Sequence, residues 1–371
     1  MKKAIGVILN VDGDNSDLND LLQHRSISTL PFGGRYRMID FTLSNMVNSG
    51  ISHIGVVGSH KYSSLIDHLG TGKEWSLSRK TQDLSILSGS SHVRFGDMIK
   101  INMRDLYNNQ AFLQHSNTDE DVVISASNLV TTFNFNSSYK IHKTNNSDVT
   151  LIFKKVQPRF TFEDNDVFIK FDKYKITDIQ YKKDNTTDYC YADMLIIKKS
   201  VLLDLMELGD RTGQWDLMDM IKNNVDTLRI FGAPHTGYIN RVNNLAKFFE
   251  SNMDLLEFDI MKELFLGKNS IHTKIKDNHP TLYENDAIVR NSIVGSGCNI
   301  KGNITHSVVF RDSHIGKNSE INNSIIMQKC EIGDHVKLNY VIFDKDVKIR
   351  DNATLIGTLD NPIVLSKGMV V

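Results

Sequence analysis

The C-terminal quarter of the chain repeats a short apolar triplet, which reads Ser292-Ile293-Val294, Ser307-Val308-Val309, Ser324-Ile325-Ile326 and Tyr340-Val341-Ile342. The triplets start 15, 17 and 16 residues apart, and single aliphatic residues lie between them. This spacing is typical of a degenerate hexapeptide repeat, in which three hexads form one coil of a parallel β-helix. Gly316 and Gly333 are expected to help the chain turn its corners. We therefore expect a parallel β-helix over residues 286–371.

A different pattern precedes the repeats, with short apolar runs separated by stretches of helical spacing. The runs are β-branched and too short for core helices, so we expect buried strands at residues 4–9, 53–57, 122–125, 149–154 and 194–197. Helices are expected between them, for example at residues 40–48 and 63–69. This alternation predicts an α/β domain over residues 1–266, with a mostly parallel sheet covered by helices on both faces.

The end of this domain is marked by an apolar stripe and then by polar sequence. Residues 245–265 carry apolar side chains at helical spacing, which predicts one helix that closes the domain. Residues 267–285 are polar, contain Pro280 and are predicted to form a linker. The last residues, 353–371, are apolar for a terminus and are expected to cap the final coil or to pack on a neighbouring subunit.

The charge and cysteine content argue against several classes of function. The 371 residues include 43 basic and 44 acidic side chains, a balance that disfavours a nucleic acid or an anionic membrane as partner. Cys190, Cys298 and Cys330 are far apart and suit reduced thiols in the cytoplasm rather than disulfides or a zinc site. No apolar run approaches the roughly 20 residues of a membrane span, and the apolar start lacks a signal-peptide cleavage site. We therefore expect a cytoplasmic globular protein.

One segment of the first domain points to a particular protein family, which the amino-acid composition of the chain does not. Residues 31–50 read PFGGRYRMIDFTLSNMVNSG. This string resembles the signature of bacterial ADP-glucose pyrophosphorylases (glucose-1-phosphate adenylyltransferases), and the resemblance extends over the whole chain. It implies a Rossmann-like nucleotidyltransferase domain followed by a left-handed parallel β-helix. It also implies the family's reaction, in which ATP and glucose 1-phosphate give ADP-glucose and diphosphate for glycogen biosynthesis.

Nucleotidyl transfer to a sugar phosphate brings two polyanions together. It needs the backbone N–H groups of a glycine-rich loop, basic side chains on the phosphates and carboxylates that hold Mg²⁺. The family's loop reads A-G-G-x-G-T-R-L, whereas residues 10–17 here include Asp12, Asp14 and Asp17 and lack most of the glycines and the arginine. A carboxylate ~4 Å from a phosphate charge costs about 4 kcal/mol at an effective dielectric of 20. We expect this loop to repel ATP.

Three further family positions have lost their functional residue types. By the resemblance, Ile27 stands where the family has a lysine, Ser127 where it has its first metal-binding aspartate, and Arg241 where it has the second. A hydroxyl is a poor ligand for a hard cation, and a guanidinium should exclude the cation. We therefore expect no catalytic residue and no bound metal in this chain. Arg241 is expected to take the space and the charge of the missing Mg²⁺.

These losses resemble the GlgD-type, non-catalytic regulatory subunit of the family. The resemblance implies a heterotetramer with a catalytic subunit, which would carry the Mg²⁺, and a response to a sugar-phosphate or other anionic effector. The effector-binding candidates are Arg25, Arg35 and Arg37, with His24 beside them, because the family binds anions near the cleft between its two domains. The alternative is that these arginines pair with acidic residues such as Asp40 or face solvent.

Two other functions are compatible with parts of the sequence. The string at residues 31–50 suits an active glucose-1-phosphate adenylyltransferase, which Ser127 and Arg241 oppose. A hexapeptide-repeat acyltransferase would need a catalytic histidine on the β-helix, where His306, His314 and His335 are available. The N-terminal domain argues against that second class.

Overall fold

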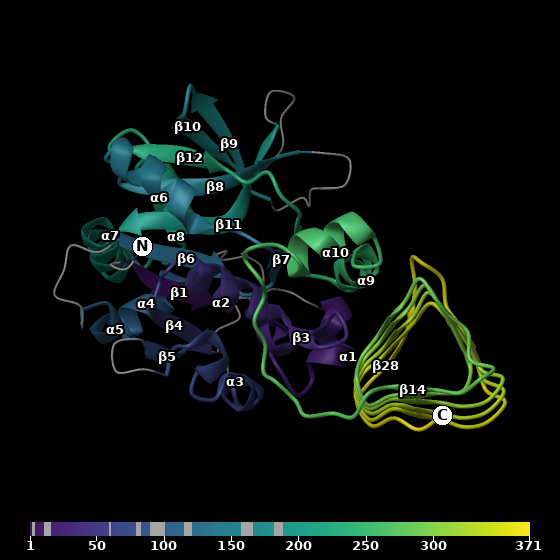
Figure 1. The fold of residues 1–371 in the computed structure, drawn as a ribbon. Coiled ribbons are helices and arrows are strands. Elements are labelled where there is room, and N and C mark those ends of the chain that lie inside the picture. Colours follow the sequence, from purple (N-terminus) through teal and green to yellow (C-terminus); the bar gives the residue numbers. More distant parts are fainter. Residues whose placement is uncertain are drawn as a thin grey trace.

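Two bodies make up the protein, an α/β domain and a triangular coil of short strands (Figure 1). The computed structural model describes residues 1, 4–10, 16–58, 61–78, 83–89, 101–114, 121–156, 166–181 and 188–371. Within these ranges, no helix combines the length and the apolar character needed to cross a membrane.

A nine-stranded sheet forms the centre of the first domain. Its strands are β1 (Ile5–Leu9), β4 (His53–Gly58), β5 (Asp83–Ser88), β6 (Asp121–Ala126), β8 (Val149–Lys155), β9 (Phe168–Asp172), β10 (Lys175–Gln180), β11 (Tyr189–Lys198) and β12 (Ile230–Pro234). The order is β5-β4-β1-β6-β11-β8-β12-β10-β9, and all five predicted strands are present. The sheet is parallel from β5 to β6 and between β8 and β12, whereas β11 is antiparallel to both its neighbours, β6 and β8. The carboxyl ends of β1, β6 and β8 therefore lie along the same edge.

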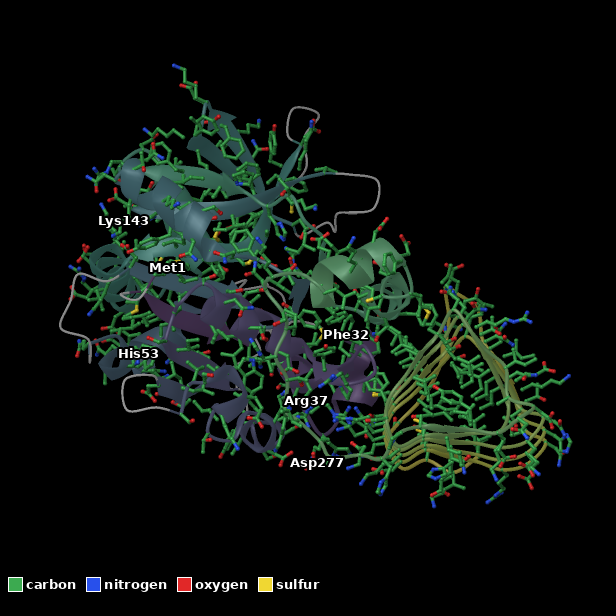
Figure 2. The ribbon with its side chains drawn as sticks, viewed as in Figure 1. Met1, Phe32, Arg37, His53, Lys143 and Asp277 are labelled. Carbon is green, nitrogen blue, oxygen red and sulfur yellow. The ribbon has the colours of Figure 1, made fainter. Side chains whose placement is uncertain are left out.

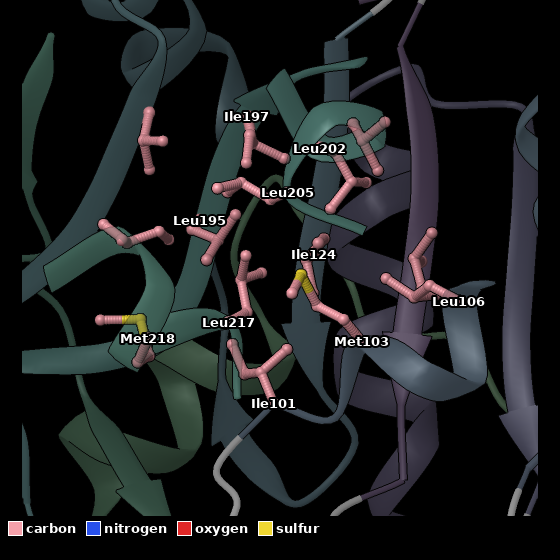
Figure 3. Packing of buried hydrophobic residues seen from close by; sticks show 14 of the residues in the cluster. Ile101, Met103, Leu106, Ile124, Leu195, Ile197, Leu202, Leu205, Leu217 and Met218 are labelled. Carbon is pink, nitrogen blue, oxygen red and sulfur yellow. The ribbon is translucent and has the colours of Figure 1, made fainter. Parts of the chain in front are cut away.

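Helices cover both faces of this sheet and bury two apolar layers. They are α2 (Met38–Asn48), α3 (Ser63–Leu69), α4 (Met103–Asn108), α5 (Gln110–Gln114), α6 (Phe135–Thr144), α7 (Lys199–Thr212) and α8 (Leu217–Asn223). Successive side chains of β1 alternate between the layers, with Val7 in one and Ile8 in the other. Figure 3 shows the layer of Val7, in which Leu205 of α7 and Met218 of α8 pack with Leu195 of β11.

The prediction of one helix over residues 245–265 is wrong. The segment forms α9 (Leu245–Asp254) and α10 (Phe258–Phe265). Leu255, between the two helices, is buried against the turn at Gly33, where an added Cβ would lie only 2.8 Å from Leu255 Cδ1. This contact with a distant part of the chain ends the first helix, while the apolar spacing continues through the break and gives no sign of it.

The second body is the left-handed parallel β-helix that the repeats predict. Its three five-stranded sheets are parallel throughout. One contains β14 (Leu282–Tyr283), β17 (Asn299–Ile300), β20 (His314–Ile315), β23 (Glu331–Ile332) and β26 (Lys348–Ile349). The next contains β15 (Val289–Arg290), β18 (Asn303–Thr305), β21 (Glu320–Asn322), β24 (Lys337–Asn339) and β27 (Thr354–Ile356). The four triplets supply most of the third, which contains β16 (Ile293–Val294), β19 (Val308–Val309), β22 (Ile325–Ile326), β25 (Val341–Phe343) and β28 (Ile363–Leu365). The C-terminal residues continue the last coil, because Val371 N–H donates to Lys348 O at 2.9 Å.

The corners of the β-helix are not turned by the glycines that the sequence suggested. Gly316 and Gly333 are not among the β-helix residues with positive φ, which are Asn291, Gly297, His306, Asp312, Asn318, Asn323, Lys329, His335, Tyr340, Asp346, Asn352 and Gly368. Gly316 instead allows two coils to approach closely, since an added Cβ would lie 2.2 Å from the carbonyl oxygen of Gly333. The repeat was therefore identified correctly, but the role of its glycines was not.

The segment between α10 and β14 is held along the first domain. Asn48 Nδ2 donates to Ser270 O at 2.9 Å, and His272 N–H donates to Ser44 Oγ at 2.9 Å. Asn48 and Ser44 both belong to α2, so the polar connection is tied to the helix formed within residues 31–50.

The two bodies share one apolar cluster. The first domain contributes α1 (Asn19–Leu22) and neighbouring residues, including Leu21 and Phe41. The β-helix contributes residues of its third sheet, including Val308 and Ile325. Figure 1 shows this face of the coil, marked by β28, turned towards α1, α9 and α10.

A buried ion pair accompanies this cluster. Nη1 and Nη2 of Arg25 donate to the two carboxylate oxygens of Asp344 at 2.9 and 2.8 Å. Their side chains are 4% and 2% exposed, and the residues are 319 positions apart in the chain. Removing one partner of such a pair leaves the other charge buried without compensation, which is far more costly than removing both.

We predict that Arg25→Met lowers the free energy of unfolding by about 3–5 kcal/mol, because Asp344 stays buried without its partner. The double variant Arg25→Met/Asp344→Leu should recover most of this loss. The matched control is Lys348→Met, which removes an exposed pair with Glu331 and should cost about 1 kcal/mol or less. Chemical unfolding followed by circular dichroism measures all three, and equal losses in the single and double variants would contradict the prediction.

Candidate functional site

The carboxyl edge of the sheet carries the predicted degenerate position Ser127. Its N–H donates to Leu9 O, at the end of β1, at 3.0 Å. Ser127 is buried, and its hydroxyl oxygen has no hydrogen-bond partner among the described atoms. Of the aspartates in the predicted loop, Asp12 and Asp14 lie outside the described residues, and Asp17 is exposed.

Arg241 is brought to the same corner by a two-stranded ladder. β7 (Leu129–Thr131) and β13 (Ile239–Arg241) are antiparallel, and Arg241 lies opposite Leu129, two residues after Ser127. The guanidinium contacts the carboxylates of Asp166 and Asp193. Burial lowers the pKa of Arg241, but the charges of Asp193 and Asp166 more than offset this and raise the pKa above its ordinary value.

The residues at this corner do not fit Mg²⁺. A hard divalent cation is held by several oxygen ligands, of which carboxylates are the strongest. Here the two carboxylates are occupied by a guanidinium, and a serine stands where the resemblance expects the other ligand. Elsewhere in the described ranges, no group of three or more His, Cys, Asp and Glu side chains is arranged to hold a metal ion. In this corner Arg241 takes the place next to the two carboxylates that a metal ion would need.

The third degenerate position, Ile27, has become part of the apolar core. It begins a short 3-10 helix (Ile27–Thr29) and is fully buried in the cluster between the two bodies. A lysine there would have to bury its charge or displace this packing. This position thus supports the contact between the domains.

The four effector candidates lie near one another at the domain junction but have different partners. Arg25 forms an ion pair with Asp344. For this residue the alternative prediction, that the arginines pair with acidic residues, is therefore confirmed, although the partner is Asp344 and not Asp40. Arg37 Nη1 donates to Ser64 O and to Ser64 Oγ, both at 2.8 Å, which ties it to α3. Figure 2 shows Arg37 on the side of the domain that faces the β-helix.

The remaining two candidates are exposed. The guanidinium carbon of Arg35 lies 5.6 Å from the centroid of the Tyr36 ring. His24 lies on the exposed turn next to Arg25. The structure therefore leaves Arg35 and His24 accessible, whereas the guanidinium of Arg25 already has a carboxylate.

The β-helix adds basic residues that sequence reasoning missed. Arg311, Gln328 and Lys345 follow one another at intervals of 17 residues and occupy equivalent positions in successive coils, two residues beyond the paired Val309, Ile326 and Phe343. Lys367 takes the next equivalent position after Leu365. The amide oxygen of Gln328 is buried without a hydrogen-bond partner in the described structure. The repeat spacing could have revealed this column, but nothing in the sequence says which face meets the other domain.

The cations of the junction influence one another. The pKa of Lys345 is lowered to about 7 by burial and by the charges of Arg37 and Arg25. Burial and the charge of Arg35 lower the pKa of Arg311. Across the described part of the chain, no ion pair joins Arg35, Arg311, Lys345 or Lys367 to a carboxylate. The junction therefore has an excess of positive charge that an anion would relieve.

The three histidines available to an acyltransferase, which would need one of them, lie on different sides of the coil. His306 and His335 occupy different corners with positive φ, the first before β19 and the second before β24. His314 is exposed in β20, which belongs to the remaining sheet. Their separation on three sides of the coil gives no support to that alternative.

Comparisons with known proteins agree with this architecture. A family model described as "Nucleotidyl transferase" matches residues 5–190, and one described as "GlmU-like, C-terminal hexapeptide" matches residues 278–361. The glycogen biosynthesis protein GlgD of Bacillus subtilis is 32% identical over 369 residues, which cover 99% of this chain and 97% of that protein. GlgD of Geobacillus stearothermophilus is 33% identical over 358 residues, with coverages of 95% and 93%. A glucose-1-phosphate adenylyltransferase of Clostridium kluyveri is 31% identical over 335 residues, with coverages of 88% and 86%.

We predict that Arg241→Met destabilises the protein by about 3–5 kcal/mol, because two largely buried carboxylates lose their shared counter-charge. The native variant then retains a proton that its unfolded chain has released, so its stability should rise as the pH falls from about 8 to about 5. Thermal unfolding across this range measures both effects. The control Arg211→Met, which removes an exposed pair with Glu207, should show neither.

The same measurement tests the absence of a metal site. Adding Mg²⁺ or a chelator should leave the thermal midpoint of the unmodified protein unchanged, since the Arg241 guanidinium already contacts both Asp166 and Asp193 and would repel a cation there. A midpoint that rises with Mg²⁺ and saturates would contradict this reading of the corner.

Proposed function

This chain belongs to the bacterial ADP-glucose pyrophosphorylase (glucose-1-phosphate adenylyltransferase) family, and we propose that it is a non-catalytic subunit that modulates a catalytic subunit in glycogen biosynthesis. The observation that carries the proposal is the contact of Arg241 with Asp166 and Asp193. A guanidinium in this corner removes the opportunity to bind the cation on which nucleotidyl transfer depends. The buried Ser127 supports the same conclusion.

The regulatory part of the proposal rests on the domain junction. Arg35, Arg311, Lys345 and Lys367 supply positive charge beside the Arg25–Asp344 ion pair, and no ion pair joins these four to a carboxylate in the described structure. A sugar phosphate or another anion bound there would contact both bodies at once and change how firmly they hold together. Such a change can be transmitted to a partner with a coupling free energy of typically about 1–3 kcal/mol.

The partner in this proposal is a catalytic glucose-1-phosphate adenylyltransferase, with which the chain forms a cytoplasmic heterotetramer. The Mg²⁺ belongs to that partner. Relatives named glucose-1-phosphate adenylyltransferase match this chain over 86–96% of its length, so the partner in this proposal would be a homologous subunit. The three cysteines are free and buried, as expected for a reducing compartment.

The decisive experiment measures ADP-glucose formation by this chain alone, by the catalytic subunit of the same organism alone, and by the two together. We predict no turnover by the lone chain with ATP, glucose 1-phosphate and Mg²⁺. The mixture should copurify as one assembly and should differ from the lone partner in maximal rate or in its response to effectors.

Turnover by the lone chain at a rate near that of the partner would favour an active adenylyltransferase and overturn the proposal. Failure to copurify with the partner, or unchanged kinetics in the mixture, would overturn the regulatory role.

A second prediction concerns the effector. In the mixed assembly, Arg35→Ala and Arg311→Met should each raise the concentration of a sugar phosphate or inorganic phosphate needed for half-maximal response by about tenfold, because a hydrogen bond to a charged group contributes about 1.5–3 kcal/mol. Lys337→Met, on a different sheet of the β-helix, is the matched control and should respond as the unmodified protein does. Arg25→Ala is unsuitable here because it also breaks the ion pair with Asp344. Effector titrations that coincide for all variants would remove the junction from the proposal.

A further inference from the structure

Lys345 belongs to the column formed by Arg311, Gln328, Lys345 and Lys367 in successive coils. Its amine lies near two arginines of the first domain, Arg25 and Arg37. It is half-buried at the end of β25, where the β-helix meets the first domain. The charged groups that face it are Arg25 and Arg37 from the first domain, and Asp344 and Lys367 from the β-helix. Three of these four are cations.

The single carboxylate among them is already in use. Asp344 Oδ1 accepts from Arg25 Nη1 at 2.9 Å and from the backbone N–H of Lys345 at 2.7 Å, and Oδ2 accepts from Arg25 Nη2 at 2.8 Å. Arg25 therefore neutralises the charge that would otherwise stabilise the ammonium of Lys345. Protonated Lys345 would add an uncompensated charge to a junction that already contains Arg37 and Lys367.

An anion changes this balance more for lysine than for arginine. A guanidinium stays charged throughout the accessible pH range, whereas a desolvated lysine can lose its proton. An anion that enters the junction restores the counter-charge and so favours the protonated amine.

We propose that an anion binds at the domain junction together with one proton, which is taken up by Lys345. This inference rests on the effector site proposed above and adds its regulation: the effector binds more tightly in acidic than in alkaline conditions. The lowered pKa of Lys345, about 7, places the change near neutrality. Below that pH the amine is charged before the anion arrives, and no proton is needed. Above it each bound anion brings a proton with it.

The test uses the full-length chain and sulfate, because sulfate does not change its own charge between pH 6 and pH 8.5, unlike a phosphate ester. Isothermal titration calorimetry at pH 6 and pH 8, in pairs of buffers with different ionisation enthalpies, gives both the affinity and the number of protons taken up. We expect close to one proton per sulfate at pH 8 and almost none at pH 6. The dissociation constant should be about tenfold larger at pH 8, since each pH unit above the pKa lowers the charged fraction about tenfold.

Variants assign the proton to its residue. Lys345→Arg keeps the charge but removes the titration, so it should bind sulfate with equal affinity at both pH values and without proton uptake. Lys337→Arg is the matched control on another sheet and should behave as the unmodified chain does. His24 lies next to Arg25, and histidine is the other side chain that titrates near neutrality. His24→Gln should therefore retain the uptake at pH 8.

The outcomes separate this inference from the function on which it rests. Sulfate binding without proton uptake at pH 8, uptake that persists in Lys345→Arg, or uptake that disappears in His24→Gln would each overturn the proton linkage while the effector site stands. Absence of sulfate binding at either pH would overturn the site and the linkage together. The proposed regulatory role is tested separately, by comparing the activity of the mixed assembly without effector with that of the catalytic subunit alone.

Discussion

The ion pair between Arg25 and Asp344 is the interaction around which the two bodies are arranged. Both side chains are buried beside the apolar cluster that the two domains share, so neither charge can be hydrated by water. The domains must therefore meet in a position in which each charge neutralises the other. The same pairing has a second consequence. Because Asp344 is paired with Arg25, the neighbouring Lys345 has no carboxylate of its own and lies near the positive charges of Arg25, Arg37 and Lys367. The interaction that joins the domains therefore also creates the environment in which an anion would be stabilised.

A second arginine pairs with carboxylates at the edge of the sheet. There the pairing occupies a site instead of creating one for an anion. Arg241 lies between Asp166 and Asp193 and compensates their charge without any ion from solution. The scaffold of a nucleotidyltransferase surrounds it: β1, β6 and β8 end at one edge, and α2, which lies within residues 31–50, packs on the sheet. The strands and their cores are stabilised by the apolar surface that they bury, and this does not depend on which polar side chains lie at the edge of the sheet.

Much of the fold could be predicted from local pattern. Short β-branched runs gave the five strands, and the repeat gave the coils, because both depend on which side chains alternate inward. The break at Leu255 could not be predicted, since the contact with Gly33 that causes it involves residues more than 200 positions apart. The glycines of the repeat were misinterpreted for a similar reason: Gly316 is required by the backbone of the next coil rather than by its own turn.

The amino-acid types alone indicate the family and the order of the two domains, and they predict the loss of the residues that nucleotidyl transfer requires. Each of these features can be recognised within a segment of a few dozen residues. The partners of the arginines are a different matter, because Arg25 meets Asp344 across 319 positions and Arg241 meets Asp166 across 75. Charge interacts through space and not along the chain. Only the assembled fold could therefore show which carboxylates pair with Arg25 and Arg241, and gather Arg311, Lys345 and Lys367 at the domain junction.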